Sequence, residues 1–257
     1  MTSIDLRGRT ALITGAFSGL GLHFAQVLAD HGAKLALAGR RIELGRSVAA
    51  EIGAAVGRPG EVRAYAMDVT DAGSVRDAIA QASADLGAPD IVVNNAGTVA
   101  RSASLDVTDA DWTGVVEVNL SGVFRVAQAS AREMVRAGKR GSIVNIASIL
   151  GLRVRSQVAS YAVTKAAVVQ MTKALALEWA EHGIRVNALA PGYFETDINR
   201  DFLRSDAGRA IVARVPQRRV GQLAELDGPL LLLASDASSY MTGAVIPVDG
   251  GHLVSSL

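Results

Sequence analysis

The chain has 257 residues, 49% of them hydrophobic, and its net charge is only +1 because 26 Lys and Arg oppose 25 Asp and Glu. This balance, with no long basic block, gives no sign of a nucleic-acid partner or of binding to an anionic membrane. Cysteine is absent, which excludes disulfides and thiolate metal sites, and the longest apolar runs, such as residues 230–234, are too short to span a membrane. Residues 1–9 show no signal-peptide pattern, so we expect a cytoplasmic protein.

Short apolar runs alternate with longer helical stretches along the whole chain. The expected strands are rich in Val, Ile, Leu and Ala and lack period-2 alternation, which is typical of parallel strands covered on both faces. This order, without a linker or a repeat, predicts one α/β domain over residues 1–257, a Rossmann-type doubly wound parallel sheet of about seven strands with helices on both faces. In chain order we expect strands at 10–14, 34–38, 62–67, 90–93, 142–146, 184–189 and 245–248, and helices near 19–31, 42–56, 72–86, 109–137, 158–182 and 222–235.

The helix expected at 158–182 is apolar on several faces, with Ala162, Val169 and Leu177 at different positions around it. A helix of this kind usually has something packed on both sides. One side belongs to the sheet. The other side indicates either a second subunit or a neighbouring loop.

A glycine-rich turn follows the first expected strand, where Thr14-Gly15 leads to Gly19, Leu20 and Gly21 at the start of a helix. Glycines let the backbone turn sharply and approach a pyrophosphate closely. The start of the helix offers unpaired N–H groups to the same anion. A tight turn with close helix packing is the alternative, but the position at the opening of a βαβ unit favours a dinucleotide site.

The T-G-x-x-x-G-x-G spacing of this turn resembles that of the short-chain dehydrogenase/reductase family, and further motifs follow in the family's order. The resemblance covers nearly the whole chain and implies a nicotinamide cofactor and a homotetramer. The motifs are Asn94-Asn95-Ala96-Gly97, Asn119 in a long helix, Ser148 closing the fifth strand, Tyr161 and Lys165 in Y-x-x-x-K, Pro191-Gly192, and Val248-Asp249-Gly250-Gly251.

Tyr161 and Lys165 suit proton transfer to a carbonyl oxygen that receives a hydride. Tyrosine ordinarily has a pKa of about 10, and a cation one helical turn away is expected to lower it. Ser148, at the carboxyl end of a strand, is placed to hydrogen-bond the substrate oxygen. The resemblance also implies that Lys165 holds the nicotinamide ribose and that Asn119 joins a water relay. A buried Asn could instead satisfy local backbone groups.

The end of the second strand favours NADP(H). An NAD site usually presents a carboxylate there, whereas this chain has Gly39 followed by Arg40 and Arg41. A guanidinium can bind a 2′-phosphate through two hydrogen bonds. Ser18 stands where the family often has a second basic residue, so the clamp looks partial and NAD(H) stays an alternative. Both arginines could instead be plain surface charges.

Other cofactor contacts are implied by position in the family. They form a set that runs from the phosphates to the nicotinamide: Gly15, Ser18, Gly19, Leu20, Gly21, Arg40, Asp68, Val69, Asn95, Ala96, Gly97, Tyr161, Lys165, Pro191, Gly192, Phe194 and Thr196. The four histidines show no ligand spacing, and hydride transfer from a nicotinamide needs no metal, so we expect no metal site.

The substrate is expected to be a small ketone or secondary alcohol. An apolar segment after Ser148 and a long irregular stretch near 193–215 favour a hydrophobic ketone such as a 3-oxoacyl group, contacting Ile149, Leu150, Arg155, Tyr193 and Phe202. A carboxylate bound by Arg153 or Arg155 would instead suit a polyol or sugar-acid dehydrogenase. A protein that senses the dinucleotide without catalysis is a third interpretation, although all four catalytic positions are kept.

Overall fold

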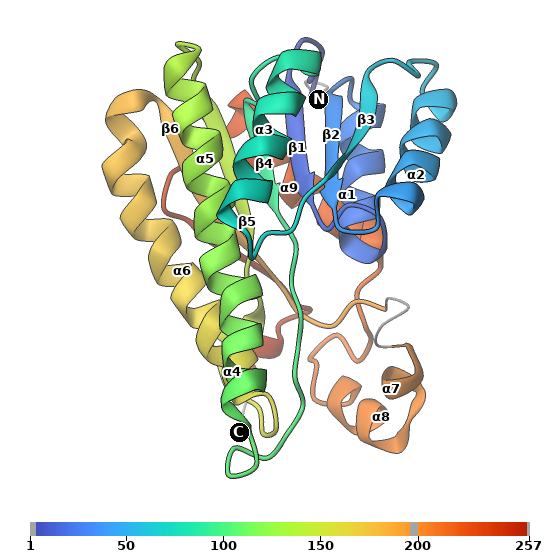
Figure 1. Cartoon of the computed structure of the whole chain (residues 1–257). Helices are drawn as coiled ribbons and strands as arrows, with labels where there is room; N and C mark the ends of the chain where they lie inside the picture. Colours follow the sequence, from blue (N-terminus) through green and yellow to red (C-terminus); the bar gives the residue numbers. More distant parts are fainter. Residues whose placement is uncertain (1–3, 196–199, 256–257) are drawn as a thin grey trace.

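The computed structural model describes residues 4–195 and 200–255, with the side chains of Phe202 and Arg204 excepted, and seven parallel strands form one sheet. The sheet order is β3-β2-β1-β4-β5-β6-β7, so the chain winds outward in both directions from β1 and β4 (Figure 1). The predicted doubly wound sheet is therefore confirmed. The strands are β1 (Thr10–Thr14), β2 (Lys34–Gly39), β3 (Val62–Ala66), β4 (Ile91–Asn94), β5 (Gly141–Ile146), β6 (Ile184–Pro191) and β7 (Val245–Val248).

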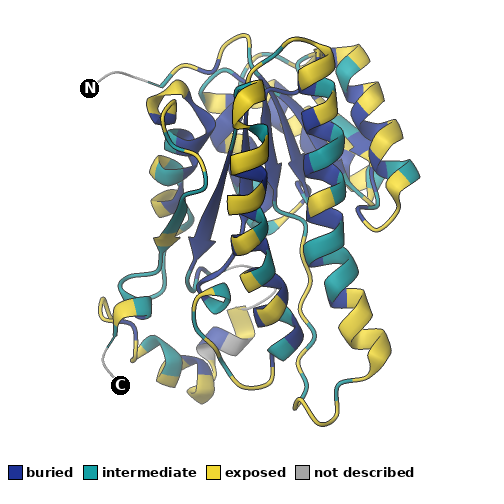
Figure 2. Ribbon diagram, turned by 90° about the vertical axis from the view of Figure 1, so that its left-hand side faces the viewer, coloured by how far each residue is buried: buried dark blue, intermediate teal, exposed yellow. Residues whose placement is uncertain are grey.

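Helices pack on both faces of the sheet and bury its apolar side chains (Figure 2). One apolar cluster joins the sheet to α1 (Gly19–Asp30), α2 (Ile42–Ala55) and α9 (Asp227–Ala234). A second cluster joins the opposite face to α3 (Ala72–Leu86), α5 (Gly122–Arg136) and α6 (Ala159–Trp179). Burial on both faces explains why the strands lack polar alternation.

The helix expected near 109–137 is interrupted. It consists of α4 (Asp109–Val116), a π-helical turn at Glu117–Ser121, and α5. Asn119 lies in that wider turn and is completely buried. Its amide donates to Thr98 O and accepts from Thr98 N, both at 2.8 Å. Single-turn π-bulges are frequent at functional sites, and this one aims an amide at the loop that follows β4.

The stretch expected to be irregular after Tyr193 contains two short helices, α7 (Arg200–Arg204) and α8 (Asp206–Val212). They lie apart from the helices that cover the sheet (Figure 1). The helix expected near 222–235 begins as a 3₁₀ turn at Leu223–Leu226 and becomes α9 only at Asp227. Pro229 stands in the first turn of α9, where a missing N–H leaves no bond unmade.

Candidate active site

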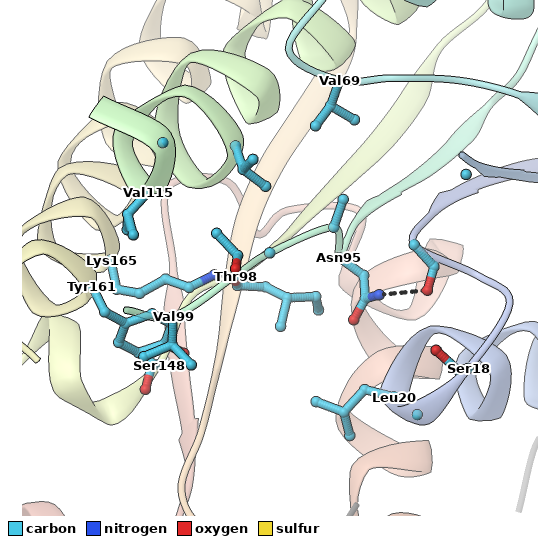
Figure 3. A pocket seen from close by; sticks show the side chains of 18 of the residues that line it. Ser18, Leu20, Val69, Asn95, Thr98, Val99, Val115, Ser148, Tyr161 and Lys165 are labelled. Atoms are coloured by element: carbon cyan, nitrogen blue, oxygen red, sulfur yellow. Dashed lines mark hydrogen bonds between the residues drawn. The ribbon is translucent and has the colours of Figure 1, made fainter. Parts of the chain in front are cut away.

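A cavity of about 1340 Å³ opens at the carboxyl ends of β1, β2, β4 and β5. It exceeds the roughly 300–1,000 Å³ of ordinary small-molecule pockets, so it has room for a dinucleotide together with a substrate. Figure 3 shows Ser18 and Leu20 at one end and Ser148, Tyr161 and Lys165 at the other. The glycine turn and the Y-x-x-x-K pair therefore line the same cavity.

The glycine turn has the geometry that its spacing predicts. Gly15 and Gly19 have φ of +63° and +56°, in the left-handed region that favours glycine. A Cβ at Gly21 would lie 2.2 Å from Gly15 O and 2.5 Å from Asn95 Nδ2. Asn95 Nδ2 donates to Thr14 O at 3.0 Å and to Gly15 O at 3.2 Å, which fixes the turn against the loop after β4 (Figure 3). A side chain at position 21 would thus break the turn that faces the cavity.

Lys165 is held deep beside Tyr161. Its Nζ donates to Ile146 O at 2.7 Å and lies 5.6 Å from the centre of the Tyr161 ring. Asn119 belongs to the same group, because a Cβ at Gly97 would lie 3.4 Å from Asn119 Oδ1 and 3.8 Å from Lys165 Nζ. The amide of Asn119 is engaged by the backbone of Thr98, which is the local role that a buried Asn can take.

Ser148 caps the short 3₁₀ turn at Ile149–Gly151 and faces Tyr161. Its hydroxyl oxygen accepts a hydrogen bond from Leu150 N at 3.1 Å. An oxygen that accepts on that side keeps its own hydrogen to donate elsewhere. The hydroxyl lies within hydrogen-bonding reach of the Tyr161 phenol, where it lowers the pKa of Tyr161. Ser148 can therefore donate to an oxygen placed between the two side chains.

Burial dominates the protonation of both partners. It raises the pKa of Tyr161 above its ordinary value, and the nearby Tyr193 raises it further, against the lowering by Ser148. Burial also lowers the pKa of the Lys165 ammonium to about 8. The direction for Tyr161 is opposite to the one expected from an adjacent cation. The reason is that taking a phenolate out of water is costlier than the neighbouring groups can offset. In the protein alone Tyr161 is a proton donor at neutral pH.

The far end of the cavity carries two arginines. Arg41 Nη2 donates to Ser18 Oγ at 3.2 Å. The family often has a basic residue at position 18, and here the guanidinium of Arg41 lies beside the serine that replaces it. Arg40 lines the cavity on the side of Asp68, and its charge helps to lower the pKa of that carboxyl, after the hydrogen bonds from Thr70. The sequence predicts only Arg40 among the cofactor contacts, with a plain surface charge as the alternative for both arginines, because only the folded turn brings Arg41 to Ser18.

Most of the predicted cofactor positions line the cavity. These are Gly15, Ser18, Gly19, Leu20, Arg40, Asp68, Val69, Asn95, Ala96, Gly97, Tyr161, Lys165, Pro191, Gly192 and Phe194. Gly21 does not line the cavity and packs against Gly15 and Asn95. Thr196 lies outside the described residues.

The predicted substrate positions are less uniform. Ile149 is buried at 2% exposure and does not line the cavity, and neither does Leu150. Arg155 Nη1 donates to the Tyr193 hydroxyl at 3.5 Å, and Tyr193 is close enough to Tyr161 to shift its pKa. The side chain of Phe202 lies outside the described part.

The substrate side has residues that the motifs did not predict. Thr98, Val99 and Arg101 line the cavity from the loop after β4. Ser102 N of this loop donates to Gln157 O at 3.1 Å, and Gln157 has a φ of +66°. The loops at 98–102 and 152–158 are thereby joined at the mouth of the site. No signal in the sequence pairs these two loops.

Within residues 4–195 and 200–255 no group of three or more His, Asp or Glu is arranged to hold a metal ion. No helix among these described residues has the length and apolar character of a membrane span.

Comparisons with known proteins agree with the motifs. A family model described as enoyl-(acyl carrier protein) reductase matches residues 15–252. Gluconate 5-dehydrogenase of Gluconobacter oxydans is 39% identical over 98% of this chain and 97% of its own. The 3-oxoacyl-[acyl-carrier-protein] reductase of Thermotoga maritima is 38% identical over 97% of this chain and 99% of its own.

Solved structures give the same result in three dimensions. The crystal structure of a gluconate 5-dehydrogenase from Burkholderia cenocepacia, in complex with NADP and tartrate, superposes with a TM-score of 0.94. It is 40% identical, and the match covers 99% of this chain and 98% of that one. The sequence matches span almost the full length of each protein and agree with the ordered motifs and the fold. The chain is therefore an oxidoreductase of the short-chain dehydrogenase/reductase family.

Proposed function

We propose that the protein interconverts a ketone and a secondary alcohol with NADP(H) as its cofactor, with Tyr161 as the general acid and base. The observation that carries this proposal is the placement of Tyr161, Ser148 and Lys165 in one cavity with the glycine turn. That cavity has the volume for a dinucleotide. The turn at its edge depends on Gly15 and Gly19, which have positive φ, and on Gly21, where a Cβ would meet Gly15 O. When bound there, the nicotinamide supplies or accepts the hydride.

The side chains divide the remaining work. In the reductive direction, Ser148 donates a hydrogen bond to the carbonyl oxygen and stabilises the charge that develops on it. Tyr161 then transfers its phenolic proton to that oxygen. Lys165 holds its ammonium near the ring and stabilises the phenolate that results. Asn119 keeps the Thr98 backbone in place beside Lys165 and acts as a positioning residue. Oxidation runs the same steps in reverse.

The preference for NADP(H) is proposed from the charges at the far end of the cavity. Arg40 and Arg41 both line it, and no carboxylate stands at Gly39. A 2′-phosphate placed between Ser18 and these guanidiniums would receive charge-assisted hydrogen bonds, which are the stronger kind. NADP is also bound in the Burkholderia relative.

For the substrate we favour a sugar acid over the apolar ketone that the sequence alone suggested first. Arg101 lines the cavity, and Arg155 contacts the Tyr193 hydroxyl close to Tyr161. Guanidiniums beside the reacting centre suit a substrate carboxylate. The Gluconobacter and Burkholderia relatives are named gluconate 5-dehydrogenases.

A 3-oxoacyl substrate is the second candidate. Val99 lines the cavity, and Leu152 and Val154 are exposed on the loop after Ser148. These apolar side chains would accompany an acyl chain, and the Thermotoga relative is named for such a reaction.

The test is turnover of NADPH and NADH by the purified protein. The panel contains keto-sugar acids, 3-oxoesters and simple ketones for reduction, and gluconate and polyols for oxidation with NADP⁺ and NAD⁺. Tyr161→Phe is assayed alongside and is expected to lower kcat by about 10²–10⁴-fold while cofactor binding persists. Best turnover with a sugar acid supports the first candidate, and best turnover with a 3-oxoester supports the second. Tight NADPH binding with no turnover of any substrate would instead favour the cofactor-sensing interpretation.

We further propose that the chain is one domain and that it assembles as a homo-oligomer, a tetramer by family resemblance. The two clusters that share the single sheet support one domain. Neighbouring helices α4, α5 and α6 expose Trp112, Phe124, Val163 and Leu177, the last at 82% (Figure 1). Contiguous exposed apolar patches mark interaction surfaces, and exposed apolar side chains on neighbouring helices support such a patch here.

Light scattering tests the assembly directly. The protein is expected to be oligomeric, and Leu177→Asp is expected to shift it toward smaller species. A monomer at assay concentrations would contradict this proposal. A cytoplasmic location stays a prediction.

A further inference from the structure

The aromatic ring of Phe17 fills a socket made by two glycines from another part of the chain. Phe17 lies in the glycine turn and is 5% exposed. A Cβ at Gly39 would lie 2.8 Å from its Cε2 and 3.0 Å from its Cδ2. A Cβ at Gly45 would lie 2.4 Å from its Cζ and 2.5 Å from its Cε1. Real side chains essentially never approach so closely, so the ring occupies the volume where both side chains would begin.

Gly39 is the position at which an NAD-specific site of this fold carries its carboxylate. Its backbone has no positive φ, so its conformation would accept any residue. What excludes a side chain at position 39 is the ring of Phe17. The ring cannot withdraw toward α2, because Gly45 of that helix already meets it on the other side. Both Phe17 and Gly39 line the cavity, so the clash falls inside the cofactor site.

We infer that Phe17, seated between Gly39 and Gly45, determines the choice between the two cofactors. This inference rests on the proposed preference for NADP(H) and names the residue that enforces it. With the ring in place, position 39 holds no acid that would bind the ribose 2′-hydroxyl of NAD(H). The cations that remain at this end, Arg40 and Arg41, attract a 2′-phosphate. Specificity then comes from denying NAD(H) its carboxylate partner as well as from binding the 2′-phosphate of NADP(H).

The inference predicts that an acid at position 39 works only when the ring is removed. Gly39→Asp alone is expected to weaken the binding of both cofactors and to lower the melting temperature, because the new side chain and Phe17 compete for one volume. The double variant Phe17→Ala with Gly39→Asp frees that volume. Hydrogen bonds from the ribose to a charged group contribute roughly 1.5–3 kcal/mol. The ratio of NADH to NADPH affinity should therefore rise by about 10- to 100-fold over that of Phe17→Ala alone.

Nicotinamide fluorescence on titration with NADPH or NADH measures the affinities. This readout requires no substrate, so a wrong assignment of the reaction would not be mistaken for a wrong assignment of Phe17. Gly39→Ala is the matched control, since it adds the Cβ without a charge. It should lower the affinity for NADPH and for NADH about equally, and adding Phe17→Ala should restore the lost affinity. Phe17→Leu, which lacks the Cε and Cζ atoms but keeps most of the volume, replaces Phe17→Ala if the larger truncation does not fold.

Two results would overturn the inference. One is a full shift toward NADH in Gly39→Asp with Phe17 intact, which would show that the ring is no barrier. The other is a double variant that folds, binds NADPH and keeps the original ratio, which would show that position 39 does not face the ribose. A shift found only in the double variant, with the Gly39→Ala loss relieved by Phe17→Ala, supports the inference.

Discussion

Lys165→Met should produce a protein that is more stable and inactive. Lys165 lies on α6, its ammonium is buried against the last residue of β5, and its pKa falls from 10.5 to about 8. At about 1.4 kcal/mol per unit, that fall corresponds to about 3 kcal/mol lost by the folded state at pH 7, where the lysine is charged in both states. Methionine has a similar length and no charge. Its gain is reduced by about 1 kcal/mol for the hydrogen bond that Lys165 donates to Ile146 O. We expect a net increase of about 2 kcal/mol in the free energy of unfolding at pH 7.

The dependence on pH separates this effect from ordinary repacking. Between the folded pKa of about 8 and the unfolded value of about 10.4, the unfolded chain binds more protons at Lys165 than the folded chain does. The free energy of unfolding of the wild type therefore increases as the pH rises through that window, and the variant, which has no group titrating there, shows no such increase. The advantage of Lys165→Met should shrink steadily from pH 8 to pH 10 and disappear near the upper end.

Urea unfolding at one protein concentration, at pH 7, 8.5 and 10, measures the difference. Lys173→Met is the control, because Lys173 is an exposed lysine on the same helix. Its effect should be small and independent of pH. A Lys165→Met protein that is less stable than wild type at pH 7, or an advantage that does not change with pH, would refute the burial argument.

Three further predictions concern the site. Ser148→Ala should lower kcat by about 10²–10³-fold with little change in cofactor affinity, as measured by steady-state kinetics and fluorescence titration; an unchanged kcat would remove Ser148 from the reaction. Arg41→Ala should lower the affinity for NADPH by about 10- to 100-fold and leave the affinity for NADH unchanged. Arg46 is an exposed arginine paired with Glu43 on the same helix, and Arg46→Ala should change neither affinity. Gln157→Gly should raise the free energy of unfolding by about 1 kcal/mol, because glycine relieves the left-handed backbone at +66°; a loss of stability would mean that the side chain contributes more than the strain.

The order of strands and the location of the site could be predicted because they depend on local patterns. Apolar runs without alternation identify buried parallel strands, and the glycine turn identifies the first βα junction whatever surrounds it. The carboxyl ends of the strands then bring Ser148 and Asn95 to the same edge. These inferences need only the spacing of residues within one segment.

Features that depend on contacts between distant segments could not be read in this way. The ring of Phe17 meets Gly45 only because α2 packs beside the glycine turn. Arg41 reaches Ser18 for the same reason. The pKa of Tyr161 was expected to fall because its neighbour in the sequence pattern is a cation. It rises because burial, which is a property of the whole fold, outweighs the lowering by the hydrogen bond from Ser148.

Two hydrogen bonds with Asn119 hold the backbone of Thr98, so the loop after β4 is anchored by its main chain while its side chains are left to contact the substrate. The Asn119 amide donates to Thr98 O and accepts from Thr98 N, as the backbone of a neighbouring strand would. These two bonds involve no side chain of the loop. Val99 and Arg101 follow in the same loop and line the cavity. We therefore expect substitutions at these two positions to change the substrate while the hydrogen bonds of Asn119 keep Thr98 in place. For directed evolution, Val99 and Arg101 are therefore the positions of this loop at which to introduce diversity first.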